Sequence, residues 1–206
     1  FKNKTILITG GTGSCGTALI NFFIKNNILA KKIIIFSRDE LKQHDLLNFL
    51  GKKKSKLFRF FLGDIRDLQR LKTAFSKVDI VIHAAALKQV PAAEYNPTEF
   101  IKTNIIGTQN VIEAAIENNV SKLLLLSTDK ASSPLNLYGA TKLCADKLFL
   151  SANNIKGSQK TSFSVLRYGN VMGSRGSVIE VFKKQMRQHN KVFLTDERMT
   201  RFNIIL

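Results

Sequence analysis

The sequence has few of the residues that cross-link small proteins or bind metals. Among its 206 residues are two cysteines, Cys15 and Cys144, and three scattered histidines, His44, His83 and His189. Two cysteines are too few for a disulfide framework, and neither residue type shows metal-ligand spacing. We therefore expect no metal site, and we interpret both cysteines as small packing residues of a protein in the reducing cytoplasm.

Long apolar runs are also missing. No run approaches the ~20 residues of a membrane-spanning helix, and the first residues lack the charged, apolar and cleavage regions of a secretory signal. We expect no membrane association. The chain has no internal repeat and no low-complexity linker. With 44% hydrophobic residues it can bury a sizeable core, and we expect residues 1–206 to form one cofactor-binding domain.

Acidic residues are scarce, 15 against 32 lysines and arginines, which gives a net charge of +17. Such an excess permits nucleic-acid binding, and the lysine cluster at 52–56 is the obvious patch. However, the lysines are spread along the chain and the cluster has no interleaved aromatic residues. We expect no nucleic-acid partner, and the charge fits a site for anionic ligands.

Apolar runs alternate with helical stretches. The runs at 33–36 and 123–126 lack period-two alternation, which is typical of central parallel strands covered on both faces. Strands are predicted at 4–9, 32–36, 57–62, 78–83, 122–127, 161–167 and 191–194. Helices are predicted at 15–27, 39–50, 67–76, 98–118, 136–153 and 177–189. This order indicates an α/β fold with a doubly wound parallel sheet, Rossmann-like and NAD(P)-binding.

A glycine-rich segment follows the first predicted strand. Gly10, Gly13 and Gly16 are spaced three apart, with Thr12 and Ser14 between them. Glycines here allow a tight turn and let backbone N–H groups approach a pyrophosphate at a helix N-terminus. An ordinary strand-to-helix turn is the alternative, but the flanking strands and helix supply the context that a dinucleotide site requires.

The end of the second strand bears on the choice of cofactor. The chain there continues with Ser37, Arg38 and Asp39. An acidic residue at this point binds the ribose of NAD, whereas a guanidinium suits the 2′-phosphate of NADP. We favour NADP; the alternatives are a surface-exposed Arg38 and an Asp39 that binds ribose or caps the next helix.

Two further strand ends carry cofactor candidates. Asp64 is placed to accept from an adenine amine, while Asp67 suits the capping of the next helix better. Small residues at the end of the fourth strand let a cofactor ribose lie against the backbone. The candidates at these ends are Asp64, Ile65, Ala84, Ala85 and Ala86.

Polar residues gather after the fifth predicted strand. Thr128, Asp129 and Lys130 precede Tyr138 and Lys142, which lie four apart and so share one helix face. An ammonium beside a phenol lowers the tyrosine pKa from ~10 toward the range of a general base. Such a base can deprotonate a sugar hydroxyl while a cofactor takes hydride. Hydride transfer alone does not need Asp129 and Lys130 as a further acid and base, so they point to additional chemistry. The alternative is that Asp129 caps a helix and Lys130 is a solvated loop residue.

These motifs together resemble a known family. The glycine spacing and the Tyr138/Lys142 pair are similar to those of the extended short-chain dehydrogenase/reductase superfamily. The stretches at 35–41, 83–88, 127–130 and 167–177 resemble one branch, the UDP-N-acetylglucosamine 4,6-dehydratases, and specifically its inverting group in pseudaminic acid biosynthesis. The resemblance runs nearly end to end.

The resemblance implies an activity: NADP-dependent dehydration of UDP-N-acetylglucosamine at C4 and C6 with inversion at C5, in a cytoplasmic homo-oligomer. Tyr138, helped by Lys142, would take the O4 proton as NADP⁺ takes hydride from C4. Lys130 would remove the C5 proton, Asp129 would protonate the departing C6 hydroxyl, and Thr128 would bind near the C4 oxygen. These roles require a lowered pKa for Lys130 and a raised pKa for Asp129.

The resemblance also implies binding residues. Asn104 matches the superfamily's structural or proton-relay asparagine. Lys88 would face the cofactor or the sugar, and the alternative is that it faces only solvent. Partial substrate-binding elements are expected at about 168–206, with candidates Asn170, Arg175, Ser177, Thr200 and Arg201. A surface charge is the alternative for Arg175. Members of the family continue well beyond this stretch, so we expect most of a C-terminal substrate lobe to be absent from residues 1–206.

Other functions remain open at this point. A retaining dehydratase of the same branch would use the same residues, because the sequence does not fix how C5 is reprotonated. A nucleotide-sugar epimerase needs only Tyr138 and Lys142, so Asp129 and Lys130 argue against it. A non-catalytic NADP-binding unit is the third alternative.

Overall fold

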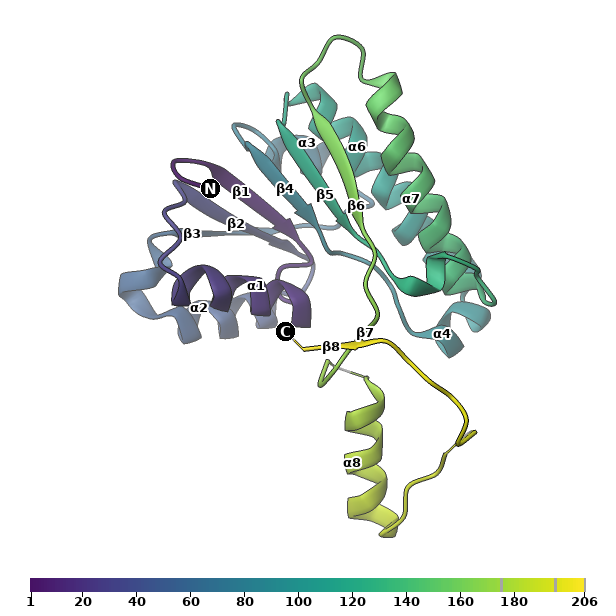
Figure 1. The fold of residues 1–206 in the computed structure, drawn as a ribbon. Helices are drawn as coiled ribbons and strands as arrows, with labels where there is room; N and C mark the ends of the chain where they lie inside the picture. The colour runs from purple at the N-terminus through teal and green to yellow at the C-terminus, as the bar shows by residue number, and fades with distance from the viewer. Residues whose placement is uncertain (175, 195, 206) are drawn as a thin grey trace.

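The computed structural model describes residues 1–174, 176–194 and 196–205. Its centre is a parallel six-stranded sheet with the strand order β3-β2-β1-β4-β5-β6. The strands are β1 (Thr5–Thr9), β2 (Lys32–Ser37), β3 (Phe58–Leu62), β4 (Ile80–His83), β5 (Lys122–Leu126) and β6 (Ser162–Leu166). The chain adds β2 and β3 on one side of β1 and then β4, β5 and β6 on the other. This change of direction confirms the predicted doubly wound sheet (Figure 1).

Helices cover the sheet in two layers. On one side lie α1 (Ser14–Lys25) and α2 (Glu40–Ser55), and on the other α3 (Leu68–Ala74), α6 (Gly107–Glu117) and α7 (Leu137–Ile155) (Figure 1). The core is divided accordingly, because successive strand residues point to opposite faces. Leu7 belongs to the cluster under α3, α6 and α7, whereas Ile6 and Ile8 belong to the cluster under α1 and α2. The strands are therefore apolar on both faces, as the unbroken runs predict.

Two predicted elements differ in the structure. Residues 191–194 form no strand, because they pair with neither sheet; the small sheet instead joins β7 (Asn170–Val171) to β8 (Asn203–Ile204). The helix predicted at 98–118 is divided into α5 (Pro97–Phe100), a π-helix η1 (Ile101–Ile106) and α6. Besides β7 and β8, two short helical elements were not predicted, α4 (Val90–Tyr95) and the 3₁₀ turn η2 (Asp129–Ala131).

The π-helix coincides with the buried Asn104. Its side chain accepts from Leu87 N and donates to Leu87 O, both at 2.9 Å, so it ties the helix to the segment after β4. Thr108 Oγ1 donates to the Asn104 carbonyl at 2.7 Å, one turn later. Side-chain bonds thus take part in holding the widened turn, which is a frequent feature of functional sites.

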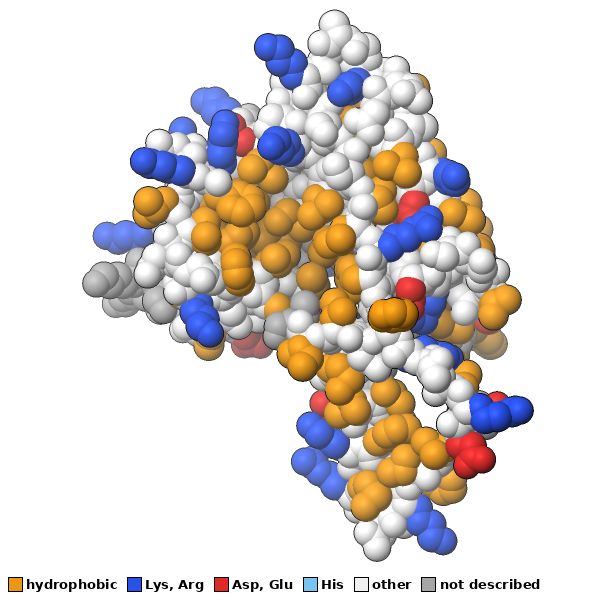
Figure 2. Space-filling model, viewed as in Figure 1, with side chains coloured by type: hydrophobic (Ala, Val, Ile, Leu, Met, Phe, Trp, Pro, Cys, Tyr) orange, Lys and Arg blue, Asp and Glu red, His pale blue; other side chains and the backbone are white. Residues whose placement is uncertain are grey.

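The last part of the chain stands apart from the sheet. Helix α8 (Val178–His189) has no buried residue, and in Figure 1 it lies beyond the carboxyl ends of the strands. Figure 2 shows apolar side chains gathered over the face of the sheet that α1 and α2 leave uncovered. Leu166 of β6, for example, is 48% exposed.

Several expectations concern surfaces and single residues. Within the described ranges no helix is long and apolar enough to cross a membrane, and no group of His, Cys, Asp and Glu is placed to hold a metal ion. Cys15 is half-buried against the core, but Cys144 is exposed. The packing interpretation of Cys144 was wrong, because its position on α7 faces away from the sheet. The side chains of Lys52, Lys53 and Lys54 lie outside the described part.

A buried histidine links β1 to the helix layer. His83 Nε2 lies 3.2 Å from Thr108 Oγ1, whose own proton goes to the Asn104 carbonyl, so the ring donates from Nε2. Its Nδ1 therefore accepts from Thr9 Oγ1, at 2.6 Å. Complete burial, with a smaller effect of the Lys142 charge, lowers the pKa of His83 to about 3.

This pKa predicts acid sensitivity. The unfolded chain protonates His83 near pH 6.5, whereas the folded chain resists protonation until about pH 3. Stability is thus fully present above pH 6.5 and is lost as the pH falls, by up to about 1.4 kcal/mol per pH unit. Urea unfolding between pH 7.5 and 4.5 measures this slope. His83→Gln should unfold more easily but with a flatter pH dependence; an unchanged slope contradicts the assignment.

Candidate active site

The strand order creates a crevice outside the carboxyl ends of the neighbouring strands β1 and β4, because the chain leaves them toward opposite faces of the sheet. The glycine loop between β1 and α1 forms its floor. Gly10 has φ +65°, and a Cβ there would meet Ala85 Cα at 2.8 Å. A Cβ on Gly16 would meet the Gly11 carbonyl at 2.4 Å. Both positions require glycine, and the loop leads into the N-terminus of α1, which suits an anionic group.

The crevice opens into two adjoining hollows. One, of roughly 640 Å³, extends past the end of β2. Its lining includes these predicted cofactor residues: Gly10, Thr12, Gly13, Ser37, Arg38, Asp64, Ile65, Ala84, Ala85 and Ala86. The other, of roughly 540 Å³, extends toward β5 and α7. Its lining includes Ser14, Gly16, Lys88, Thr128, Lys130, Tyr138, Asn170 and Ser177.

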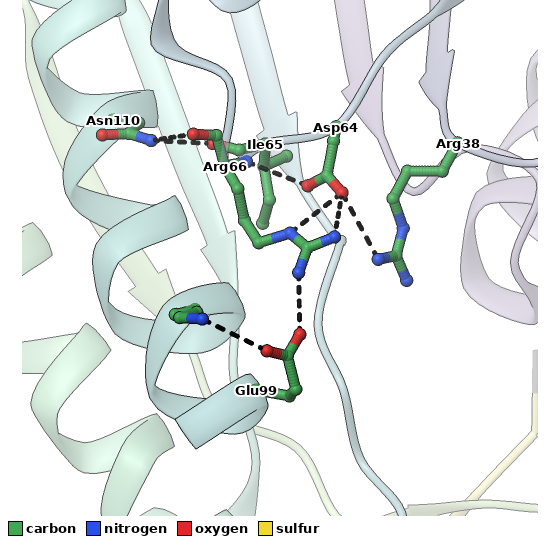
Figure 3. Close-up of polar contacts among 7 residues, drawn as sticks. Arg38, Asp64, Ile65, Arg66, Glu99 and Asn110 are labelled. Carbon is green, nitrogen blue, oxygen red and sulfur yellow. Dashed lines mark hydrogen bonds and ion pairs between the residues drawn. The ribbon is translucent and has the colours of Figure 1, made fainter. Parts of the chain in front are cut away.

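An ion-pair cluster borders the first hollow (Figure 3). Asp64 Oδ2 accepts from Arg66 at 2.7 and 3.0 Å and lies 3.4 Å from Arg38 Nη1. Arg66 also bonds Glu99 of α5 at 2.8 Å. Although burial acts to raise it, hydrogen bonds from Arg66 and the charge of Arg38 hold the pKa of Asp64 below its usual range. The carboxylate is thus a fixed anion that orients Arg38 at the edge of the hollow.

Asp39 and Lys42, which follow Arg38, differ in where their side chains lie. Asp39 Oδ1 accepts from Lys42 N at 2.9 Å, so Asp39 caps α2. Its Oδ2 pairs with the Lys42 ammonium. Lys42 lines both hollows and was not singled out from the sequence, although its position four residues after Arg38 places it on the first turn of the predicted helix. Asp67 caps α3 by accepting from Arg70 N, as predicted.

The side chains of the polar residues after β5 lie close together. Thr128 caps η2, and its hydroxyl donates to Asp129 Oδ1 at 2.9 Å. Lys130 Nζ donates to the same oxygen at 3.2 Å and to Asn170 Oδ1 at 2.9 Å. Asp129 therefore caps neither this turn nor α7, whose cap is Asn136. The two residues form an ion pair beside the hollow.

The expected pKa of Asp129 is contradicted. Burial acts to raise it, but hydrogen bonds from Thr128 and Lys130 and the lysine charge hold the pKa of Asp129 below its usual range. The carboxyl group is therefore ionised at neutral pH in this arrangement. Its role as an acid requires that a proton reach it from a neighbour.

The pKa of the tyrosine also differs from the expectation. Tyr138 lines the hollow, and burial raises the pKa of its phenol, although a hydrogen bond to Thr128 acts in the opposite direction. Lys142, one turn on, is buried and donates to the Leu126 carbonyl at 2.9 Å. Burial, partly offset by the charge of Asp146, lowers the pKa of Lys142 to about 8. The shared helix face is confirmed, but the predicted lowering of the tyrosine pKa was wrong here because desolvation outweighs the stabilisation of the phenolate.

Buried side chains hold α7 in place. Asn104 Nδ2 donates to Thr141 Oγ1 at 3.1 Å, and Thr141 donates to the Tyr138 carbonyl at 2.8 Å. At the N-terminus of α7, Glu94 of α4 accepts from Leu137 N at 2.8 Å. Asn104 borders neither hollow, so in this structure it supports the helix; its predicted contact with a cofactor stays a prediction.

A buried carboxylate lies one turn beyond Lys142. Asp146 is 1% exposed, and its Oδ2 accepts from Arg167 Nε at 2.8 Å. Arg167 follows β6 and also donates to Ser132 at 3.3 Å. The pair joins α7 to the chain that leads into the substrate-side segment.

The predicted substrate-side residues do not all meet. Asn170 and Ser177 border the second hollow, while Thr200 and Arg201 are exposed and border neither hollow. Arg175 lies outside the described residues. Sequence reasoning missed Tyr168, whose hydroxyl is hydrogen-bonded to the Cys15 sulfur, and Asn203 of β8. A contact between β7 and β8 leaves no signal in sequence spacing.

A doubly wound sheet, a glycine loop at its switch point and a tyrosine–lysine pair on α7 define a short-chain dehydrogenase/reductase type of protein. The chain belongs to the family described as "Polysaccharide biosynthesis protein", which it matches over residues 6–206.

Known proteins agree with the resemblance stated above. The chain is 58% identical, over its whole length, to the UDP-N-acetylglucosamine 4,6-dehydratase (inverting) of Campylobacter jejuni subsp. jejuni serotype O:23/36 (strain 81-176), and covers 61% of it. It is 48% identical to the UDP-glucose 4-epimerase of Rickettsia bellii (strain OSU 85-389), over 98% of this chain and 59% of the relative. The solved structure of Pen from Bacillus thuringiensis matches all of the chain and 62% of its own, with 44% identity and a TM-score of 0.94. The chain thus spans about three fifths of these proteins.

The Asp146–Arg167 pair predicts a coupled effect on stability. Arg167→Met leaves a buried carboxylate unpaired and should lower the free energy of unfolding by roughly 2–3 kcal/mol, since Arg167 is itself half exposed. Adding Asp146→Asn should restore much of the loss. Urea denaturation measures both. Lys183→Met, which removes a 3.9 Å exposed pair with Glu180, is the control. Equal losses of stability in Arg167→Met and Lys183→Met would contradict the role of the buried pair.

Proposed function

We propose that the protein dehydrates UDP-N-acetylglucosamine between C4 and C6, with inversion at C5, as a step toward pseudaminic acid or a related surface glycan. The observation that carries this proposal is the meeting of Thr128, Lys130 and Tyr138 at one hollow, with Asp129 paired to Lys130 beside it. An elimination needs a base that removes a proton and an acid that protonates the leaving group, in addition to the tyrosine. The names of two curated dehydratases that are 56% and 58% identical to the chain support it.

The residues present fit a dinucleotide. Gly10 and Gly16 have no room for a side chain, and the loop leads into α1, where backbone N–H groups suit a pyrophosphate. Residues 1–167 would hold the cofactor, and the elements at about 168–206 would contribute part of the substrate site.

We assign the cofactor as NADP. Arg38 is held at the edge of the first hollow by Asp64, and Lys42 adds a second cation on the same edge. Asp39, the acidic residue after β2 that would bind the ribose of NAD, instead caps α2 and is paired with Lys42. Two cations suit a 2′-phosphate better than a neutral ribose.

The chemistry of the residues follows from their positions. The nicotinamide, when bound, supplies reversible hydride transfer at C4 and C6. Tyr138 removes the O4 proton. Because burial raises the pKa of its phenol, the phenolate needs the nearby positive charge of Lys142 to stabilise it. Thr128 forms a hydrogen bond near O4. Lys130 removes the C5 proton made acidic by the 4-ketone, and Asp129 protonates the C6 oxygen as it leaves as water.

An epimerase is the second candidate, because relatives at 48% identity carry that name. It would use Tyr138 and Lys142 and leave the Asp129–Lys130 pair idle. A retaining dehydratase would share every residue named here. The homo-oligomeric assembly and the cytoplasmic location stay predictions.

The dehydratase activity is tested by proton NMR in D₂O with UDP-N-acetylglucosamine and NADP⁺. We expect a 6-deoxy-4-keto sugar with deuterium at an inverted C5. Lys130→Ala and Tyr138→Phe should each lower kcat by about 100-fold or more, while Lys147→Ala, an exposed lysine of α7, should not. A C4 epimer formed without loss of water would make the protein an epimerase. Cofactor binding without turnover would make it a binding unit.

The cofactor assignment has its own test. Arg38→Ala should weaken NADP⁺ binding by about 10- to 100-fold, as expected for a lost charge-assisted hydrogen bond, with little effect on NAD⁺. Titration calorimetry measures both dissociation constants, with Arg187→Ala on α8 as a charge-matched control. Equal weakening of both cofactors would contradict the 2′-phosphate site.

A further inference from the structure

Lys130 donates to two acceptors of different kinds. Asp129 Oδ1, at 3.2 Å, belongs to a carboxyl group that can gain and lose a proton. Asn170 Oδ1, at 2.9 Å, belongs to an amide that does not titrate. The shorter contact is therefore with the partner whose hydrogen bonding is the same at every pH.

The elimination proposed above changes the protonation of this pair. Lys130 must be an uncharged amine, and Asp129 a carboxylic acid, when the C5–H bond breaks. One proton passing from Nζ to the carboxylate converts the ammonium–carboxylate pair into this form without any net change in protons. The amine then takes the C5 proton and the acid gives its proton to the leaving C6 oxygen, which restores the ion pair.

This transfer disturbs one hydrogen bond of Lys130 but not the other. As the proton moves, Asp129 changes from acceptor to donor, so its bond to Nζ reverses. Asn170 Oδ1 accepts from an ammonium and from an amine alike. Only the amide can hold the nitrogen in place through the whole cycle.

We propose that Asn170 is a positioning residue that holds the Lys130 amine toward the hollow in both protonation states. This inference rests on the proposed dehydratase function and deepens it. It gives Asn170 a role toward the base, in addition to the substrate contact expected from the sequence.

The small sheet fixes Asn170 in turn. Its backbone N–H donates to the Phe202 carbonyl at 2.7 Å, and it lies opposite Asn203 in the β7–β8 register. Gly169 permits this approach, because a Cβ there would lie 2.3 Å from the Phe202 oxygen. The segment around β8 thereby contributes to the placement of Lys130.

The first test measures Lys130 in the protein without substrate. Trace labelling with acetic anhydride across pH, read by peptide mass spectrometry, gives the pH midpoint of Lys130 reactivity, with Lys147 as the internal standard. The other titratable and charged groups that line this hollow are Cys15, Lys42, Lys88, Tyr138 and Tyr168, and Asp129 lies beside it; they are identical in every variant.

Asn170→Asp keeps an acceptor and adds a negative charge, so the midpoint of Lys130 should rise by about one pH unit or more. Asn203→Asp places the same charge on the facing strand without a described contact to Lys130, and should shift the midpoint less. Equal shifts, or none in Asn170→Asp, would overturn the proposed contact.

The second test separates positioning from substrate binding. Asn170→Ala should lower kcat and the rate of deuterium uptake at C5 by about 10- to 100-fold, with KM little changed. Gly169→Ala, which retains the amide but displaces β8, should show the same pattern; circular dichroism confirms that each variant is folded. A raised KM with unchanged kcat would make Asn170 a substrate contact only. If the wild type forms no dehydrated product, the proposed function fails, and the labelling result alone decides the contact.

Discussion

A continuous set of buried hydrogen bonds joins the glycine loop to the helix that carries Tyr138. It runs from Thr9, just before the glycines, through His83 and Thr108 to Asn104, and from there to Thr141 and the Tyr138 carbonyl. Each member is nearly inaccessible to water, so an unmade bond would leave a polar group without compensation. The distance between the glycine loop and Tyr138 is therefore set by side chains from five elements, β1, β4, η1, α6 and α7, and the hollows depend on it.

Burial also decides the electrostatics of the site. It lowers the pKa of Lys142 to about 8 and raises that of Tyr138, which shifts both groups toward their neutral forms while the lysine stays largely charged at neutral pH. Asp129 and Lys130 are less deeply placed and remain an ion pair. A bound substrate that excludes water would weaken the preference for the charged pair, because charges are stabilised by solvent. The proposed proton transfer between them is thus coupled to the filling of the hollow.

The sequence predicted the elements that carry strong local signals. All six strands of the main sheet were predicted, and unbroken apolar runs mark inner strands such as β2 and β5, since buried parallel strands must be apolar on both faces. It failed where long-range contacts decide. Residues 191–194 have the composition of a strand but no partner, whereas Asn170–Val171 and Asn203–Ile204 are short and pair across the chain. The π-helix could not be predicted, because it depends on Asn104 meeting Leu87.

The sequence by itself determined the doubly wound sheet, the glycine loop and the helix that places Tyr138 and Lys142 on one face, because each follows from local spacing and periodicity. The tertiary structure decided which groups meet and in what charge state. It paired Arg38 with Asp64, brought Asn170 to Lys130 from a strand held by β8, and kept Asp129 ionised. These outcomes depend on burial and on contacts between distant segments, and neither quantity is encoded in the spacing of residues along the chain.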